Sequence, residues 1–152
     1  VYKRQAERAF KHEKKFIMMN GDELKDINFK AMNKVHKKHN AIATLGLASV
    51  PYKKGGGVVK LRGNRIVQFS EKPRGEKGGS KLINAGAYIL SPEIFELIPR
   101  GKMVSIEKEI FPQVAAMNRL YGVDMRKRQF LQTDNFERFE NAIFNWKGFK
   151  RA

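Results

Sequence analysis

Cysteine is absent from the 152 residues of this chain. A disulfide framework and a thiolate-bound metal site are therefore excluded. No apolar run approaches the roughly 20 residues that cross a bilayer, and no secretory signal is recognisable at the start. We therefore expect a protein of the cytoplasm with no membrane partner.

Acidic residues are also scarce, because 15 Asp and Glu stand against 31 Lys and Arg, a net charge of +16. Such a surface attracts polyanions, which include nucleic acids, nucleotides and sugar phosphates. The alternative is a lysine-rich solvated surface without a specific partner, because net charge reports on association and not on fold. The hydrophobic share of 41% is typical of a globular chain, and the length is enough for one domain with a sizeable core.

The first half of the chain alternates short apolar runs with one amphipathic segment. Residues 16–19 are apolar and too few for a helix, so they predict a short, fully buried strand. From residue 28 to 40, apolar residues recur at helical spacing between lysines, with Asn28 suited to cap the start and Asn40 to close the end. Residues 41–50 are small and β-branched and predict a buried strand. Strand, helix and strand in this order predict a βαβ unit with parallel pairing.

The second half adds a hairpin, more strands and three helices. Gly63-Asn64 divides an alternating run and predicts a hairpin turn. Ser91 and Ser105 each precede a helical pattern and predict N-caps, and Pro112 is expected to kink the second of these helices. The expected elements are a hairpin at 58–69, a loop at 70–80, strands at 81–90 and 121–125, and helices from 91, from 105 and over 133–146.

The strand at 16–19 runs directly into Asn20-Gly21-Asp22. In an open parallel α/β sheet, ligands lie beyond the carboxyl ends of the strands. A glycine there lets the backbone approach a ligand, and the Asp22 carboxylate is suited to Mg²⁺, which prefers oxygen ligands and usually bridges to phosphates. Taken alone, these residue types more often form an Asx-type turn, in which Asp22 bonds only local backbone.

Two further tripeptides carry polar groups at strands. Glu71-Lys72-Pro73 enters a Gly-rich loop. A glutamate there can accept hydrogen bonds from hydroxyls, and a lysine is a compact charge for phosphate, although the tripeptide also describes an ordinary solvated strand end. Asn84-Ala85-Gly86 interrupts an apolar strand, which indicates either a bulge or a ligand brought close to the backbone.

The order of these motifs is more specific than any one of them. The chain contains, in order, NGD, GVV, EKP, LINAGAYILSPEIFELIP and SIEKEIFP. This series resembles the sugar-nucleotide pyrophosphorylases, the nucleotidyltransferases that make NDP-sugars from an NTP and a sugar 1-phosphate, over residues 6–146. The resemblance implies an α/β, Rossmann-like nucleotidyltransferase fold with a mostly parallel sheet.

The resemblance also implies roles for individual residues. Asp22 looks like the family aspartate that binds Mg²⁺ beside the phosphates. Glu71 looks like the residue that contacts sugar hydroxyls, and Lys72 like the catalytic residue that contacts the sugar phosphate. Asn84 and Gly86 look like part of the wall of the sugar pocket.

One departure from the family pattern lies in the expected sugar pocket. Gly57 matches the glycine of the family's Y-G-V-V and is assigned to sugar binding on that basis. Gly56 replaces the tyrosine, so that side of the pocket differs from the family's.

A second departure lies near the end of the chain. The family often has an aromatic residue followed two positions later by an aspartate that adds a metal contact. Here Phe130 stands at the aromatic position and Gln132 at the aspartate. Asp134, two residues later, is a candidate to replace that metal ligand, but Asp134 and Glu137 also have the spacing of a capping box, which explains both residues without a ligand and is favoured.

The largest departure concerns the start of the family's fold. The family begins with a strand and a Gly-rich loop, G-G-x-G-T-R-L, that holds the triphosphate and a catalytic arginine; neither occurs in this sequence. Residues 6–152 are therefore expected to be the C-terminal part of a nucleotidyltransferase domain. Residues 1–5, VYKRQ, match what a transposon-type sequencing adapter encodes in one frame and are expected to be non-native read-through, the alternative being an ordinary basic helix start.

The expected function is sugar-1-phosphate nucleotidyl transfer with Mg²⁺ as cofactor and an NTP and a sugar 1-phosphate as partners. This chain would supply the sugar half of the site and be inactive alone. The alternatives are a basic nucleic-acid-binding module, which rests on charge alone and shows no recognised signature, and a non-catalytic regulatory relative of the family. Members of the family often form oligomers, so the oligomeric state of this chain, including a homo-oligomer, is left open.

Overall fold

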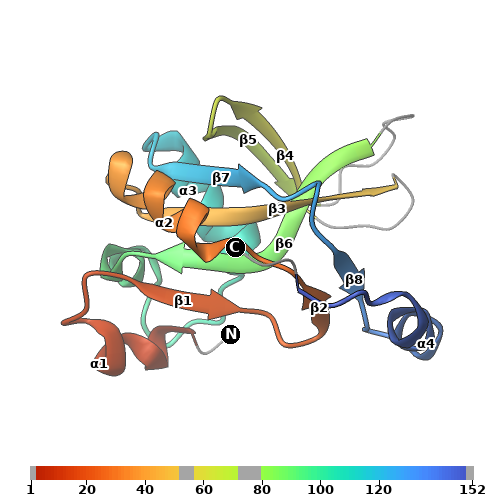
Figure 1. Ribbon diagram of the computed structural model, residues 1–152. Coiled ribbons are helices and arrows are strands. Elements are labelled where there is room, and N and C mark those ends of the chain that lie inside the picture. The colour runs from red at the N-terminus through yellow and green to blue at the C-terminus, as the bar shows by residue number, and fades with distance from the viewer. Residues whose placement is uncertain (1–2, 52–56, 72–79, 150–152) are drawn as a thin grey trace.

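The computed structural model of the chain describes residues 3–51, 57–71 and 80–149. A six-stranded sheet has the order β1-β6-β3-β7-β5-β4, and a two-stranded sheet pairs β2 with β8 (Figure 1). The strands are β1 (Phe16–Met19), β2 (Glu23–Lys25), β3 (Ala43–Pro51), β4 (Gly57–Arg62), β5 (Arg65–Glu71), β6 (Ser80–Leu90), β7 (Leu120–Asp124) and β8 (Phe130–Gln132). The α-helices are α1 (Glu7–Phe10), α2 (Phe29–Lys38), α3 (Phe111–Ala116) and α4 (Phe136–Asn145).

Several of these elements begin, end or turn at the residues that the sequence predicted. The Asn28 side chain accepts a hydrogen bond from the Ala31 amide and so caps α2. Asn40, with φ of 46°, closes the helix in the left-handed region. The hairpin β4–β5 is confirmed, and Gly63, with φ of 59°, occupies its turn. Each of these signals acts within about four residues of the chain.

The pairing of the predicted βαβ unit is wrong, although the α/β class is confirmed. β1 and β3 run in the same direction, but both pair antiparallel with β6, which lies between them. β3 and β7 form the one parallel pair among the described strands, so the pairing here is mixed rather than mostly parallel. The strand–helix–strand pattern fixes strand direction, whereas the later, mostly buried β6 inserts between the two strands.

β1 is half-buried, which corrects the expectation of a fully buried strand. Its inward residues alternate with Ile17 and Met19, which are 53% and 47% exposed. Within the described part of the chain β1 pairs only with β6 and so lies at an edge of the sheet.

The segment from residue 105 is helical as predicted, in two short pieces that adjoin at residues 110 and 111. Ser105 caps the first piece, a π-helical turn (Ile106–Ile110), by accepting from the Lys108 amide. Pro112 lies in the first turn of α3, where its missing N–H is not needed. The segment after Ser91 is a 3₁₀ helix (Pro92–Leu97). None of the helices described is long and apolar enough to cross a membrane.

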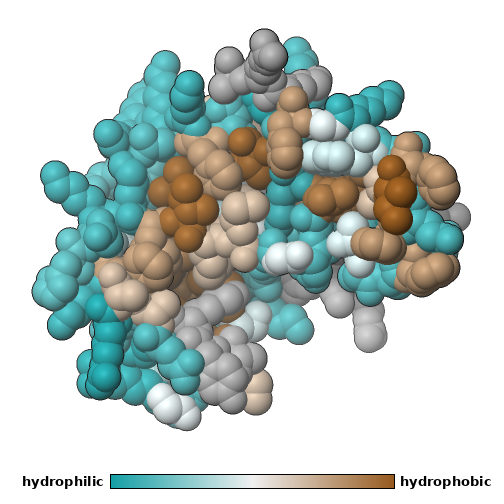
Figure 2. Space-filling view, turned by 60° about the horizontal axis from the view of Figure 1, so that its bottom comes forward, coloured by the Kyte–Doolittle hydropathy of each residue, from teal (hydrophilic) through white to brown (hydrophobic). Residues whose placement is uncertain are grey.

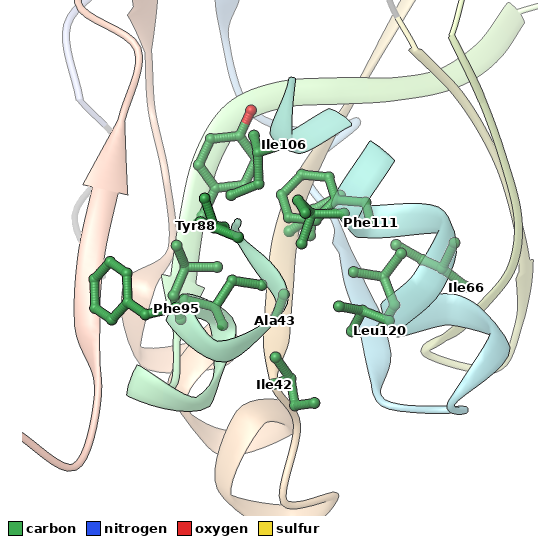
Figure 3. Packing of buried hydrophobic residues seen from close by; sticks show 14 of the residues in the cluster. Ile42, Ala43, Ile66, Tyr88, Phe95, Ile106, Phe111 and Leu120 are labelled. Atoms are coloured by element: carbon green, nitrogen blue, oxygen red, sulfur yellow. The ribbon is translucent and has the colours of Figure 1, made fainter. Parts of the chain in front are cut away.

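The main core lies between the sheet and the helical pieces that follow β6 and precede β7 (Figure 3). Tyr88, Phe111 and Leu120 are fully buried there. The Tyr88 and Phe111 rings meet with centroids 5.4 Å apart. Burying a large apolar side chain of this kind stabilises a fold by roughly 1.5–3 kcal/mol.

A buried histidine joins α2 to the sheet. His36 is 5% exposed, and its Nδ1 and Nε2 lie 3.0 Å from Thr44 Oγ1 and 3.2 Å from Ser91 Oγ. Ser91 Oγ in turn donates to the Ala41 carbonyl. Burial, followed by the charges of Lys15 and Arg119, lowers the pKa of His36 to about 4. The ring is therefore neutral in the folded state at neutral pH.

The pH dependence of stability tests this arrangement. Because the folded pKa of His36, about 4, lies below the ordinary value, protons favour the unfolded chain. The contribution of His36 to the free energy of unfolding is fully present above pH ~6.5, where the ring is neutral in the folded and unfolded chain. It falls by about 3 kcal/mol by pH 4, because the unfolded chain takes up a proton there first. We expect His36→Gln to flatten this fall, measured by urea unfolding across that range. Parallel curves for wild type and His36→Gln would contradict the assignment.

Candidate functional site

The end of β1 turns into β2 beside a distortion in β6. The Asn20 amide donates to the Gly86 carbonyl over 2.8 Å. Gly21 and Asp22 are exposed, and the Asp22 carbonyl accepts from the amide and the hydroxyl of Thr133. The NGD segment therefore lies between β6 and the end of β8, where it places the Asp22 side chain at the surface.

The Asn84–Gly86 segment forms a bulge. Gly86 has φ of 60°, and its amide donates to Asn84 Oδ1 over 3.1 Å. A Cβ at Gly86 would lie 2.5 Å from Glu23 Oε2 and 2.7 Å from Asn20 Nδ2. Of the two explanations that the sequence left open, the bulge is confirmed; the close approach of a ligand stays a prediction.

A buried ion pair closes one side of the bulge. Lys25, whose side chain is 1% exposed, donates to Glu23 Oε2 over 2.5 Å and to the carbonyls of Ala85 and Gly86 over 3.2 and 3.0 Å. All three ammonium hydrogens thus have an acceptor. Burial raises the pKa of Glu23, the hydrogen bond from Lys25 opposes the rise, and the charges of Asp22 and Glu107 add to it.

A second polar chain lies on the other side of the bulge. Asn84 Nδ2 donates to the Tyr88 hydroxyl over 2.8 Å, and that hydroxyl donates to Glu107 Oε1 over 3.0 Å. Burial, with the charge of Glu107, raises the pKa of Tyr88, so the phenol stays protonated. Asn84 and Glu107 are both partly exposed. Asn84 Nδ2 also lies 3.4 Å from Glu107 Oε1, so an amide and a carboxylate stand side by side here.

Four residues of this site were missed in the sequence: Glu23, Lys25, Tyr88 and Glu107. The spacing of two between Glu23 and Lys25 and of four between Asn84 and Tyr88 puts each pair on one face of a strand. That spacing is the available signal, but it does not reveal that the charged pair is buried.

The structure brings some of the predicted site residues together. Asn20 and Glu23, which flank Asp22 in the chain, both adjoin Gly86, so Asp22 lies in the same region as the Asn84–Gly86 bulge. Gly57 pairs with Glu71, and the neighbouring Val58 pairs with Ile83, the residue before Asn84. Lys72 and the side chain of Glu71 lie outside the described residues.

The surroundings of Asp134 favour a structural role. Its carboxylate accepts two hydrogen bonds from Arg138, at 2.7 and 2.8 Å, and these lower its pKa. The predicted capping box of Asp134 and Glu137 is wrong, because Asn135 is the N-cap of α4 and its side chain accepts from the Arg138 amide. Gln132 pairs with Glu23 across the small sheet. Asp134 as a metal ligand stays a prediction, with Arg138 as its competitor.

Replacement of Gly86 tests the fixed geometry of the bulge. Gly86→Ala would place a methyl against the Glu23 carboxylate, which can move only by giving up Lys25. Gly63→Ala is the matched control, because Gly63 has nearly the same φ but no atom within 4 Å of the added Cβ. We expect a loss of about 1 kcal/mol for Gly63→Ala from backbone strain and about 3 kcal/mol for Gly86→Ala from strain plus overpacking, measured by urea unfolding. Equal losses would show that the Glu23 contact is not a constraint.

Comparison with known sequences agrees with this arrangement of motifs. The family model described as nucleotidyl transferase matches residues 3–147. The mannose-1-phosphate guanyltransferase of Yarrowia lipolytica is 43% identical over 112 residues, which cover 72% of this chain and 30% of that protein. The UTP–glucose-1-phosphate uridylyltransferase of Synechocystis is 34% identical over 114 residues, which cover 72% and 29%. The chain thus spans about 30% of the length of the curated relatives that it matches.

Solved structures share the fold at low identity. A Bacillus anthracis protein described as a glucose-1-phosphate thymidylyltransferase matches with a TM-score of 0.77 and 18% identity, over 97% of this chain and 61% of that one. HddC from Yersinia pseudotuberculosis matches with a TM-score of 0.70 and 21% identity, over 95% and 60%. Because the family model covers most of the sequence and the fold agrees, this chain belongs to the nucleotidyl transferase family.

Proposed function

We propose that the chain is the sugar-binding part of a sugar-1-phosphate nucleotidyltransferase, which makes an NDP-sugar and pyrophosphate from a sugar 1-phosphate and an NTP. The observation that carries this proposal is the proximity of the NGD segment, the Asn84–Gly86 bulge and Glu107 to one another. The names of the relatives, which act on mannose 1-phosphate and glucose 1-phosphate, support the substrate class.

Asn84 and Glu107 are assigned to binding the hydroxyl groups of the sugar. A sugar offers several hydroxyls, each of which both donates and accepts, and a partly exposed amide beside a carboxylate complements that pattern. Tyr88 is a positioning residue, because its buried hydroxyl bonds both groups and fixes their separation. Glu71 and Gly57, at the open end of the hairpin, are assigned to the same pocket.

In the proposed reaction, an oxygen of the sugar 1-phosphate attacks the α-phosphorus of the NTP. A bond forms between these atoms, the bond from the α-phosphorus to the bridging oxygen breaks, and its electron pair leaves with pyrophosphate. Such a transfer depends on in-line positioning and on compensation of phosphate charge. Lys72 is assigned the cationic contact with the sugar phosphate.

The residues present fit a Mg²⁺ ion at Asp22. Its side chain is exposed, and its carbonyl, not its carboxylate, makes the contacts with Thr133. No group of three His, Asp or Glu that could hold a metal occurs in the described part of the chain. The ion would therefore take most of its ligands from phosphates and water, as Mg²⁺ commonly does. When bound, it would supply charge compensation for the phosphates.

Measurements of binding and turnover with the purified chain test whether it supplies only the sugar-binding part of the site. The sequence has no G-G-x-G-T-R-L loop, so we expect no pyrophosphate release with Mg²⁺, any NTP and either sugar 1-phosphate. We do expect glucose 1-phosphate or mannose 1-phosphate, but not inorganic phosphate alone, to shift the amide resonances of Asn84 and Gly86. Robust pyrophosphate release would contradict the first expectation, and unchanged amides with both sugars would contradict the second.

Asp22→Asn tests the metal assignment. In a chimaera that joins a relative's Gly-rich loop segment to this chain, we expect this variant to lose several kcal/mol of transition-state stabilisation, because an amide binds Mg²⁺ poorly. Stability should not change, since the backbone contact with Thr133 is retained. Asp124→Asn, at the exposed end of β7, is the control and should keep full turnover. Near-normal turnover of Asp22→Asn at limiting Mg²⁺ would reduce Asp22 to a turn residue.

A further inference from the structure

The positive charge in the middle of the chain is not balanced by nearby carboxylates. No Asp or Glu occurs between residues 27 and 70, a stretch that holds α2, β3 and most of the hairpin β4–β5. Lys34 and Lys38 are exposed on α2. At the turn of the hairpin, Arg62 is exposed and Arg65 is partly exposed. None of these four cations has an ion-pair partner among the residues described.

The two arginines of the hairpin lie on the same face of the sheet as α2. The apolar residues between α2 and the sheet form a cluster of their own. Leu61 and Ile66 of the hairpin belong instead to the main core, on the face that α3 covers (Figure 1). Because alternate side chains of a strand point to opposite faces, Arg62 and Arg65 point to the face of α2. The strand order puts β5 and β4 at the end of the sheet opposite β1, so the hairpin extends this face beyond β7.

Two stacked rings lie between the helix and the hairpin. His39, the C-cap of α2, stacks on Tyr121 of β7 with ring centroids 4.4 Å apart and ring planes at 13°. Tyr121 is also the residue of β7 that pairs with Arg65. Both rings are partly exposed. A nucleobase can extend such a stack, because every base has an aromatic face.

The hairpin turn is held in place beside these rings. Asn64 Nδ2 donates to the Gly122 carbonyl over 3.0 Å, and the Gly122 amide donates to the Asn64 carbonyl over 2.8 Å. Arg62 and Arg65 lie directly opposite each other across the hairpin, and like charges in this position are destabilising. An anion bound between them removes that repulsion. The structure thus holds a pair of cations at a fixed place next to Tyr121.

Apolar side chains are scarce on this face. Among the described side chains of α2, β4, β5 and β7, Val67 is the one large apolar side chain that is exposed. The apolar side chains visible in Figure 2 gather instead on the β1 side of the molecule and over α4. A surface that inserts into a membrane carries aliphatic or aromatic side chains opposite its lysines. Cations beside a ring stack are typical of a surface that binds single-stranded nucleic acid.

We propose that the face formed by α2 and the hairpin β4–β5 binds a single-stranded nucleic acid. Its phosphates contact Arg62, Arg65 and Lys38, and one of its bases stacks on the His39–Tyr121 pair. A duplex fits less well, because its bases are already stacked on one another and do not reach the rings. The site uses none of the residues assigned to the sugar or its phosphate, so this binding is independent of the proposed function.

Binding of labelled oligonucleotides to the purified chain tests the proposal. The probe is a short fluorescein-labelled oligo(U), and the matched control is an abasic strand with the same number of phosphates. By fluorescence anisotropy at about 0.15 M salt, we expect oligo(U) to bind at least about tenfold more tightly than the abasic strand, a difference of about 1.4 kcal/mol. A parallel titration with oligo(dT) shows whether RNA or DNA is the better ligand, and a preference of either strand over the abasic control supports the proposal.

Charge variants locate the phosphate contacts. Arg62→Gln with Arg65→Gln should weaken oligo(U) at least about tenfold. The same pair should reduce the slope of log affinity against log salt by about 1.4, as the loss of two phosphate contacts predicts. The matched control is Lys102→Gln with Lys108→Gln, at two exposed lysines outside this face, and it should change neither quantity.

Variants of Tyr121 separate stacking from charge. Tyr121→Leu should abolish the preference for oligo(U) over the abasic strand, whereas Tyr121→Phe, which keeps a ring, should retain it. Affinity for the abasic strand should be the same in both variants as in the wild type, which also shows that the variants are folded.

Three results would overturn the proposal. The first is equal affinity for oligo(U) and the abasic strand, or no binding of either, which would leave a surface that attracts polyanions only through its charge. The second is equal loss of affinity in the arginine pair and the lysine control pair. The third is displacement of oligo(U) by vesicles of phosphatidylserine and phosphatidylcholine but not by unlabelled oligo(U), which would identify a membrane-binding surface instead.

Discussion

The ammonium group of Lys25 connects β2 to the bulge of β6 at one point. It donates to Glu23 on the same strand and to the carbonyls of Ala85 and Gly86 on the bulge of β6. A buried ammonium is tolerated only when it is paired and fully hydrogen-bonded, so β2 must stay against the bulge. The bulge in turn requires glycine, since a side chain at Gly86 would occupy the space of Glu23. The positions of Asp22 and Asn84 depend on this arrangement.

This arrangement is not optimal for stability. Burial raises the pKa of Glu23, and the charges of Asp22 and Glu107 add to the rise although Lys25 opposes it, which means that burial and the neighbouring carboxylates together outweigh the benefit of its partner. Buried pairs of this kind are often no more stabilising than apolar residues of the same volume. Groups that are retained against such a penalty concentrate at functional sites. The energetics of Glu23 therefore agree with a site in which geometry has taken precedence over stability.

The features that could be predicted from the sequence are those decided within a few residues. The caps Asn28 and Ser105 and the turn at Gly63 depend on neighbouring amides and dihedral angles. The pairing of β1 with β6 joins residues about seventy positions apart, and nothing in the apolar run of β1 specifies that partner. The burial of Lys25 likewise depends on carbonyls sixty residues away, so its sequence neighbourhood resembles a solvated turn.

The distribution of charge indicates why a cation would be needed for a phosphate to bind at the candidate site. The chain as a whole carries +16, and such a field draws anions toward the molecule from a distance. Around the bulge the balance is different, since the charges of Asp22 and Glu107 both act on Glu23 there and Lys25 is ion-paired with Glu23. A phosphate drawn in by the overall charge would meet local carboxylates, and short-range repulsion between partly buried charges is strong. A divalent cation at Asp22 removes this conflict, because it lets a carboxylate and a phosphate share one site. The local charges therefore support the proposed Mg²⁺ site independently of the family resemblance.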